Sequence, residues 1–254
     1  KDIVNVVERI KGKRVYNDYP AWRTFYVKDP RGDHVSITGD KVRQIKCKRL
    51  KDLHKERKIN TGKTFYESDM KPEVKCLSET YNGIESPTLN TAFFDIETDF
   101  DASRGFADPS DPFMPITAIT VHLQWLDLLV TLVIPPKAMR TGEGLVEAQR
   151  ICDQFPNTEL YLNEGDMLND FMDVIEDADV LTGWNSEGYD IPYTVNRITK
   201  ILSKSHTRKL CLWDLYPQKR KVMKYGKEQE TFDLFGRIHL DYLELYRKYT
   251  YHEM

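Results

Sequence analysis

The chain has 254 residues, of which 40% are hydrophobic and 30% are charged, and its formal net charge is -3. This composition is typical of a globular protein that can bury one large core or two ordinary ones. The most apolar stretch, residues 123–136, is interrupted by Asp127 and ends in two prolines. The sequence therefore excludes a membrane-spanning segment, and it shows no signal peptide.

The charges are unevenly distributed along the chain. Residues 41–58 contain nine Lys or Arg against two acids, and residues 204–227 contain eight against one. A solvated surface is the commoner explanation, but two basic segments beside an acidic centre also suit a polyanion held against bound cations. The four cysteines show neither zinc spacing nor a disulfide framework, which indicates reduced thiols in a cytosolic protein.

Residues 1–90 predict a small mixed α+β domain. Short β-like pieces at residues 24–27 and 34–37 are separated by turn signals and suggest a β-hairpin, and residues 48–57 predict a basic helix. Because the chain starts at Lys1 without a methionine and stops directly after a helical pattern, we expect it to be part of a longer protein.

Residues 91–254 predict an α/β domain with a mixed sheet. Strands are expected at residues 92–98, 116–123, 128–134, 159–162 and 179–184, and helices at residues 143–152, 164–175 and 191–202. A β-meander followed by alternating helices and strands is the arrangement of ribonuclease-H-like nucleases. A Rossmann fold is disfavoured because no glycine-rich phosphate loop follows any of the strands.

The octet T-A-F-F-D-I-E-T at residues 91–98 ends an apolar run with two carboxylates. Side chains alternate along a strand, so Asp95 and Glu97 point to one face and their neighbours to the other. Two carboxylates on a buried strand persist only if a proton, a cationic side chain or a metal relieves their repulsion. The alternative is an acidic turn at the end of a core strand, because Asp99 and Asp101 follow.

A further acid, Asp190, falls where the strand at residues 179–184 leads into a helix, within the frame W-N-S-E-G-Y-D-I-P-Y. On its own, Asp190 is most simply an N-cap, because Pro192 occupies the first turn of the expected helix. Combined with the earlier acid pair, Asp190 is better interpreted as a third metal ligand.

At this point the two motifs identify a family. F-F-D-I-E-T and T-G-W-N-S-E-G-Y-D-I-P-Y resemble the first and second exonuclease motifs of family B DNA polymerases, especially those of T-even-type bacteriophages. Residues 221–249 resemble the exonuclease β-hairpin with the strand and helix that follow it, and residues 66–77 resemble the region that precedes the exonuclease. The resemblance implies an amino-terminal domain at residues 1–90 and a ribonuclease-H-like 3′-5′ exonuclease domain at residues 91–254.

The resemblance further implies a proofreading nuclease that hydrolyses the primer 3′ end with two divalent metal ions, Mg²⁺ or Mn²⁺. By match to the motifs, Asp95 is shared between the metals, Glu97 binds the metal on the nucleophile side, and Asp190 holds the second metal. Asn185 and Tyr189 are implied to place the unpaired 3′ nucleotide. Loop hydrogen bonding and core packing are the alternative roles of these two residues.

The family pattern also contains a third motif, Tyr-x-x-x-Asp, and no such spacing follows Asp190. Asp241 and Glu244 are possible substitutes, although the resemblance places them before that motif. The palm and finger motifs of a polymerase are absent as well. We therefore expect the isolated chain to bind metal weakly and to show little or no nuclease activity.

The implied partners are a DNA primer–template with its single-stranded 3′ end and the remainder of the polymerase, namely its palm, fingers and thumb. A sliding clamp and RNA are open possibilities, and the implied location is the host cell cytoplasm if the chain is phage-encoded. Two other functions stay open: a non-catalytic nucleic-acid-binding fragment, whose binding is sensitive to salt but indifferent to Mg²⁺, and one chain of a split polymerase.

Overall fold

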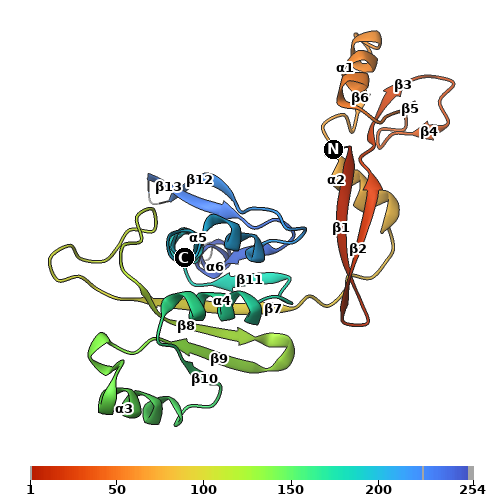
Figure 1. Ribbon diagram of the computed structural model, residues 1–254. Helices are drawn as coiled ribbons and strands as arrows, with labels where there is room; N and C mark the ends of the chain where they lie inside the picture. Colours follow the sequence, from red (N-terminus) through yellow and green to blue (C-terminus); the bar gives the residue numbers. More distant parts are fainter. Residues whose placement is uncertain (1, 225, 251–254) are drawn as a thin grey trace. The chain divides into compact units, whose positions relative to one another are not determined.

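The computed structural model describes residues 2–224 and 226–250. The chain forms two compact units, Lys1–Thr88 and Leu89–Met254, which are shown in Figure 1. The first unit carries small antiparallel sheets, and the second carries a six-stranded mixed sheet with helices. The expected fold class, a mixed α/β domain preceded by a small α+β domain, is confirmed. The assignment of each unit to a part of a polymerase stays a prediction.

The first unit combines a long hairpin with a four-stranded antiparallel sheet of order β4-β5-β3-β6. Its elements are β1 (Ile3–Ile10), β2 (Lys13–Pro20), β3 (Arg23–Lys28), β4 (His34–Val35), β5 (Lys41–Cys47), α1 (Leu50–Ile59), β6 (Phe65–Tyr66) and α2 (Pro72–Thr80). The hairpin suggested at residues 24–37 is replaced by a different pairing, because β3 and β4 both pair with β5. The hairpin β1–β2 was not predicted. Neither of its strands contains a buried residue, so the sequence lacks the alternation of apolar and polar residues that marks a half-buried strand.

The second unit is built on a six-stranded sheet of order β10-β9-β8-β7-β11-β14. Its elements are β7 (Thr91–Thr98), β8 (Ile116–Leu123), β9 (Leu128–Val133), α3 (Gly142–Cys152), β10 (Thr158–Leu160), α4 (Glu164–Val174), β11 (Val180–Gly183), α5 (Asp190–Ile201), β14 (Ile238–Asp241) and α6 (Tyr242–Thr250). Short 3₁₀ helices lie at Gln124–Leu126, Lys137–Met139 and Lys204–Leu210. The expected meander β7–β8–β9 is antiparallel, whereas β11 and β14 extend the sheet in parallel with β7.

One face of the sheet forms the core of this unit together with α4 and α5. Phe94 of β7 is buried, and its ring centroid lies 5.8 Å from that of Phe171 in α4. Tyr193 of α5 is also fully buried in the same hydrophobic cluster. Helix α4 begins as the sequence predicts, because Asn163 caps it by accepting a hydrogen bond from the backbone N–H of Asp166.

A second hairpin, β12 (Gln218–Lys224) and β13 (Lys227–Asp233), contacts α5. It corresponds to the hairpin that the resemblance implies. Its expected turn includes Tyr225, which lies outside the described residues. Within residues 2–224 and 226–250, none of the helices has the length and apolar character that crossing a membrane requires.

Candidate functional site

Strand β7 presents the acid pair on one face of the sheet. Along this strand Ala92, Phe94 and Ile96 are buried, whereas Asp95 and Glu97 are exposed. The strand lies between β8 and β11 in the middle of the sheet, so its position is fixed from both sides. The predicted alternation is therefore correct, and both carboxylates are open to solvent or to a ligand.

Asp190 is brought to the same strand by the start of α5. It is the first residue of that helix, its exposed fraction is 3%, and its Oδ1 accepts a hydrogen bond of 3.2 Å from the backbone N–H of Ile96. The N-cap interpretation is wrong, because Tyr189 occupies the N-cap position and the Asp190 carboxylate bonds across to β7. The structure thus joins the two motifs through the residue between Asp95 and Glu97.

The electrostatic environment of Asp190 disfavours its charge. Burial, together with the neighbouring Asp95 carboxylate and more weakly that of Asp241, raises the pKa of Asp190 to about 7. Such a group is relieved by a proton or by a cation placed between the carboxylates.

The donor chemistry of these residues fits a hard divalent cation, because carboxylate oxygens are the ligands that Mg²⁺ prefers. The neighbouring carboxylates of Asp95 and Asp241 raise the pKa of Asp190, and a bound cation would relieve this repulsion. Among the residues that the structure describes, however, no group of three or more His, Cys, Asp or Glu side chains is arranged to hold a metal ion. The roles of Asp95, Glu97 and Asp190 as metal ligands therefore stay predictions.

The turn between β11 and α5 holds the two residues that were predicted to contact the substrate. Asn185 has a φ of 56°, and its carbonyl oxygen accepts hydrogen bonds from the N–H groups of Gly188 (2.9 Å) and Tyr189 (3.1 Å). The side-chain Oδ1 of Asn185 is buried and has no hydrogen-bond partner within the described part of the chain. Asn185 thus shapes the turn with its backbone and keeps a side-chain acceptor for another group.

Tyr189 makes contacts within the fold. Its hydroxyl lies 3.0 Å from Oγ1 of Thr98 at the end of β7, and its ring centroid lies 5.3 Å from that of Tyr193. Both alternative roles, hydrogen bonding and packing, are therefore observed for Tyr189. The hydroxyl pair also links the second motif to the end of the first.

Of the two possible substitutes for a fourth carboxylate, Asp241 lies near the site. It is buried at the end of β14, it contributes to the raised pKa of Asp190, and it accepts backbone hydrogen bonds from Glu187 (3.2 Å) and Leu243 (3.0 Å). Glu244 is exposed on α6, where it pairs with Arg247. Asp241 is thus a structural acceptor that adds negative charge beside Asp190.

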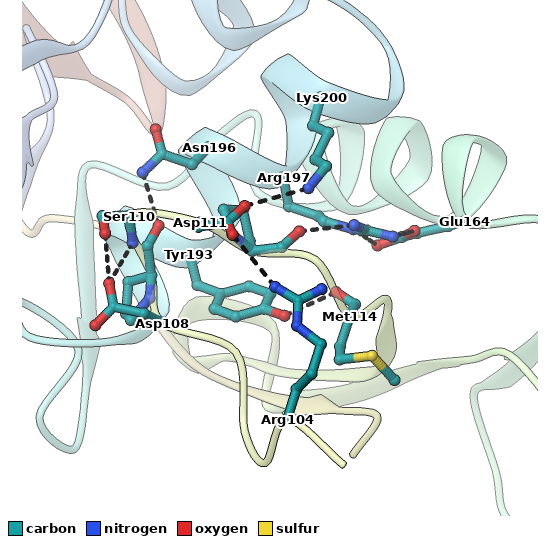
Figure 2. A network of polar contacts seen from close by, with 12 residues as sticks. Arg104, Asp108, Ser110, Asp111, Met114, Glu164, Tyr193, Asn196, Arg197 and Lys200 are labelled. Carbon is teal, nitrogen blue, oxygen red and sulfur yellow. Dashed lines mark hydrogen bonds and ion pairs between the residues drawn. The ribbon is translucent and has the colours of Figure 1, made fainter. Parts of the chain in front are cut away.

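Helix α5 also holds the long loop that follows Glu97, a role that sequence reasoning missed. Figure 2 shows this polar network. Side chains of α5 donate to loop carbonyls: Asn196 to Pro109 (2.8 Å), Arg197 to Pro112 (2.8 Å) and Tyr193 to Met114 (2.7 Å). Asn196, Arg197 and Lys200 follow Tyr193 by three, four and seven residues, so all four side chains lie on one face of the helix. That spacing is the sequence signal that could have identified them.

A buried ion pair stands behind this loop. Arg197 donates from Nε and Nη2 to the two carboxylate oxygens of Glu164 in α4, each at 2.6 Å, and both side chains are more than 90% buried (Figure 2). Glu164 also accepts a hydrogen bond of 2.9 Å from the backbone N–H of Ile116, the first residue of β8. The pair thus fixes α5 and the loop relative to the sheet that carries the acid pair.

A mixed sheet with an acid pair on its central strand, and a buried acid at the start of an adjoining helix, is consistent with the ribonuclease-H-like class of nuclease folds. The sequence comparison specifies the family: the model of "DNA polymerase family B, exonuclease domain" matches residues 33–253. The chain therefore belongs to this family. The match extends across both compact units, because it begins well before Leu89.

Individual relatives agree with this assignment. The chain is 30% identical to the DNA-directed DNA polymerase of Escherichia phage RB69 over 203 residues, which cover 69% of this chain and 21% of the relative. It is 34% identical to the DNA-directed DNA polymerase of Enterobacteria phage T4 over 91 residues, or 35% of this chain and 10% of the relative. The DNA polymerase catalytic subunit of Saimiriine herpesvirus 2 (strain 11) is 29% identical over 124 residues, or 46% and 11%. The chain thus spans about a fifth or less of the relatives it matches.

Proposed function

We propose that this chain contributes the 3′-5′ proofreading exonuclease of a replicative DNA polymerase, and that it acts on the unpaired 3′ end of a primer. The single observation that carries the proposal is the hydrogen bond from the Ile96 N–H to Asp190, which brings together the acids of two motifs. Membership of the exonuclease-domain family supports the same reaction.

In this proposal Asp95, Glu97 and Asp190 hold two divalent ions, Mg²⁺ or Mn²⁺. Bound metal of this kind activates a water, orients the scissile phosphate and stabilises the departing 3′ oxygen. The two exposed acids, Asp95 and Glu97, are available from the open face of the sheet, and Asp190 is fixed from behind by β7. Glu97 additionally orients the attacking water by accepting one of its hydrogen bonds.

Asn185 and Tyr189 are proposed to position the terminal nucleotide. The buried Oδ1 of Asn185, which lacks a partner among the described residues, can accept a hydrogen bond from a donor group of that nucleotide. Tyr189 is oriented by Thr98, so its ring keeps a fixed place beside the acid pair.

We further propose that three candidate carboxylates without a preformed metal cluster support only weak activity in the isolated chain. Membership of the family supports DNA and the remainder of the polymerase as proposed partners, and the phage relatives support a proposed location in the host-cell cytoplasm. A sliding clamp and RNA stay predictions, because no contact within the described residues bears on them.

The test uses the full chain with an end-labelled single-stranded oligonucleotide, in Mg²⁺, in Mn²⁺ and in EDTA. We expect metal-dependent shortening from the 3′ end with a turnover below about 1 s⁻¹, the low end of ordinary enzyme rates. The shortening should disappear in Asp95→Asn and persist in Asp99→Asn, which removes an exposed acid just beyond the motif. Faster turnover that still requires Asp95 would contradict the weak-activity expectation but not the nuclease.

The alternative, a nucleic-acid-binding fragment without chemistry, has one supporting observation. On β5 the basic residues Lys41, Arg43 and Lys46 are exposed, Lys41 and Arg43 on one side of the strand and Lys46 on the other, so basic side chains border both sides of this strand. Binding that falls with salt, is unaffected by Mg²⁺ and is accompanied by no shortening would favour this function over the nuclease. A split polymerase would be shown by a separate chain that restores robust cleavage when added.

A further inference from the structure

We infer that Glu187 and Arg220 form a positioning pair that couples the hairpin β12–β13 to the turn at residues 184–189, which leads into Asp190. The functional meaning of this coupling rests on the proposed nuclease function, because that function makes Asp190 a metal ligand. The pair itself is defined by contacts within the chain. It links the proposed exonuclease site to the hairpin through side-chain contacts.

Arg220 connects three segments of the chain. Its Nη2 donates to Oε1 of Glu187 in the turn, and its Nε donates at 2.6 Å to Oδ1 of Asp233 in the opposite strand of the hairpin. The exposed fraction of the Glu187 side chain is 17%, so this ion pair is partly shielded from solvent. A shielded, charge-assisted contact stabilises a geometry more than an exposed one does.

Arg220 also lies next to the last residues of the hairpin that pack in the hydrophobic core. Phe232 and Leu234, at and just beyond the base of β13, are buried in the main hydrophobic cluster. The strand register pairs Arg220 with Thr231, immediately outside the Lys219–Phe232 pair. Farther out, Met223 is exposed, and Val222 and Met223 pair with the polar residues Gln229 and Glu228. Arg220 is therefore the first firm contact outside the core.

The inner side of the outer hairpin rests on a polar and hollow interface. The side-chain Oε1 of Gln229 and Oγ1 of Thr231 are buried but have no hydrogen-bond partner in the described part of the chain. A pocket of about 280 Å³ is lined by Glu228–Glu230 of β13 and by Gly188, Asn196 and the loop at residues 108–110. Unsatisfied polar groups contribute little cohesion, so the Arg220 ion pair is an important link between the outer hairpin and the turn.

Backbone hydrogen bonds within the turn join Glu187 to the start of α5, and the Glu187 N–H also donates to Asp241 of β14 at 3.2 Å. The N–H groups of Gly188 and Tyr189 donate to the carbonyl of Asn185, and the N–H of Ile191 donates to the carbonyl of Ser186 at 2.9 Å. These bonds fix Glu187 to the first turn of α5. Displacement of the hairpin by a nucleic-acid strand is thereby transmitted through Arg220 and Glu187 to Tyr189 and Asp190.

Hydrogen exchange of backbone amides in the full chain tests the coupling without metal or DNA. In Arg220→Gln we expect exchange at Gly188, Tyr189 and Ile191 to increase about tenfold, the effect of losing a charge-assisted hydrogen bond. Arg220→Lys keeps the charge and one donor, and should restore protection to within about threefold of the wild type. This rescue distinguishes a coupling role from a merely structural role of the side chain.

Lys221→Gln is the matched control. It removes a neighbouring cation on the same strand that pairs with Glu228 in the hairpin, and it should leave the turn amides unchanged. Glu187→Gln is the reciprocal variant and should accelerate exchange at Thr231. This variant provides the test if Arg220→Gln does not fold. Equal effects of Arg220→Gln and Lys221→Gln, or acceleration in the hairpin alone, would overturn the inference. Because exchange is measured without catalysis, its failure is separate from failure of the nuclease proposal.

Discussion

The backbone N–H of Ile96 and the carboxylate of Asp190 form a hydrogen bond of 3.2 Å between residues that are far apart in the sequence. Ile96 itself is buried in the core, so the strand cannot shift without moving Asp190. This contact means that the two candidate metal-binding motifs are assembled by the fold of the second unit, before any ligand binds.

A first prediction concerns the charge of Asp190. Asp190→Asn keeps an oxygen acceptor for the Ile96 N–H but removes a buried negative charge beside Asp95 and Asp241. At about pH 8, above the raised pKa of Asp190, and without divalent metal, we expect the variant to be more stable than the wild type by roughly 1–2 kcal/mol, because an uncompensated buried charge is unfavourable. Urea unfolding in EDTA measures this difference. Stabilisation by Mg²⁺ should be present in the wild type and absent in the variant.

Asp99→Asn is the control for that experiment, since it removes an exposed acid just beyond the motif. It should leave both the stability in EDTA and the response to Mg²⁺ unchanged. A wild-type unfolding curve that does not respond to Mg²⁺ or Mn²⁺ would contradict metal binding at Asp190.

The site was partly predictable because its acids lie at positions with regular geometry. Alternation along one strand was enough to place Asp95 and Glu97 on the same face, and a helix start located Asp190. The direction of the Asp190 side chain was not predictable, because an N-cap and a ligand share the same local sequence. Only the tertiary neighbour Ile96 shows that this carboxylate bonds across to β7 instead of capping α5.

A second prediction concerns the buried pair of Arg197 and Glu164. Arg197→Met leaves the Glu164 carboxylate buried without its partner and removes a donor from the Pro112 carbonyl. We expect a loss of about 3–5 kcal/mol in the free energy of unfolding. The double variant with Glu164→Gln should recover part of that loss, because the unpaired charge is then gone. Urea denaturation of the two variants gives both values.

Lys200→Met is the matched control on the same helix. Its ion pair with Asp111 is exposed, with an N–O distance of 3.5 Å, so the variant should change the stability by less than about 0.5 kcal/mol. A similar loss in Arg197→Met and Lys200→Met would show that burial of the pair is not what stabilises the loop.

The long loop after Glu97 shows why other parts could not be predicted. Its composition of Gly, Pro and Asp indicates irregular structure. The groups of the loop that accept hydrogen bonds from α5 are backbone carbonyls, which every residue has, so the sequence does not reveal them. The hairpin β1–β2 was missed for a related reason, since its strands lack buried positions. Contacts made by the main chain, or by strands exposed on both faces, are set by tertiary structure.

A third prediction compares two glycines in the turn region. A Cβ at Gly183 would lie 2.5 Å from the backbone oxygen of Phe94, whereas a Cβ at Gly188 would meet the side-chain Oδ1 of Asn185 at 2.8 Å. The backbone of Phe94 lies in a central strand and cannot move away from the added methyl group, so Gly183→Ala should lower the free energy of unfolding by about 2–3 kcal/mol. The Asn185 side chain can rotate, so Gly188→Ala should cost only about 1 kcal/mol. Thermal unfolding ranks the two variants, and the reverse order would contradict the observed packing.

Gly188→Ala should also separate stability from function. Because it displaces the Asn185 side chain, it should weaken binding of a single-stranded 3′ end in the same way as Asn185→Ala. The double variant should then bind no more weakly than either single variant. Additive losses would indicate that Gly188→Ala acts independently of Asn185, and unchanged binding in Asn185→Ala would indicate that Asn185 does not contact the nucleotide.

The last prediction concerns the thiols. All four cysteines are buried and free, and burial raises the pKa of Cys211 to about 11 and also raises the pKa values of Cys47 and Cys152. The thiolate is the reactive form, so at pH 8 these groups should react slowly with a disulfide reagent in the folded chain. The rate for Cys211 should rise as the pH approaches 11, provided that the chain stays folded. Unfolding in urea should expose four thiol equivalents that react at once. Rapid labelling of Cys211 at pH 8 without urea would contradict its burial in the core.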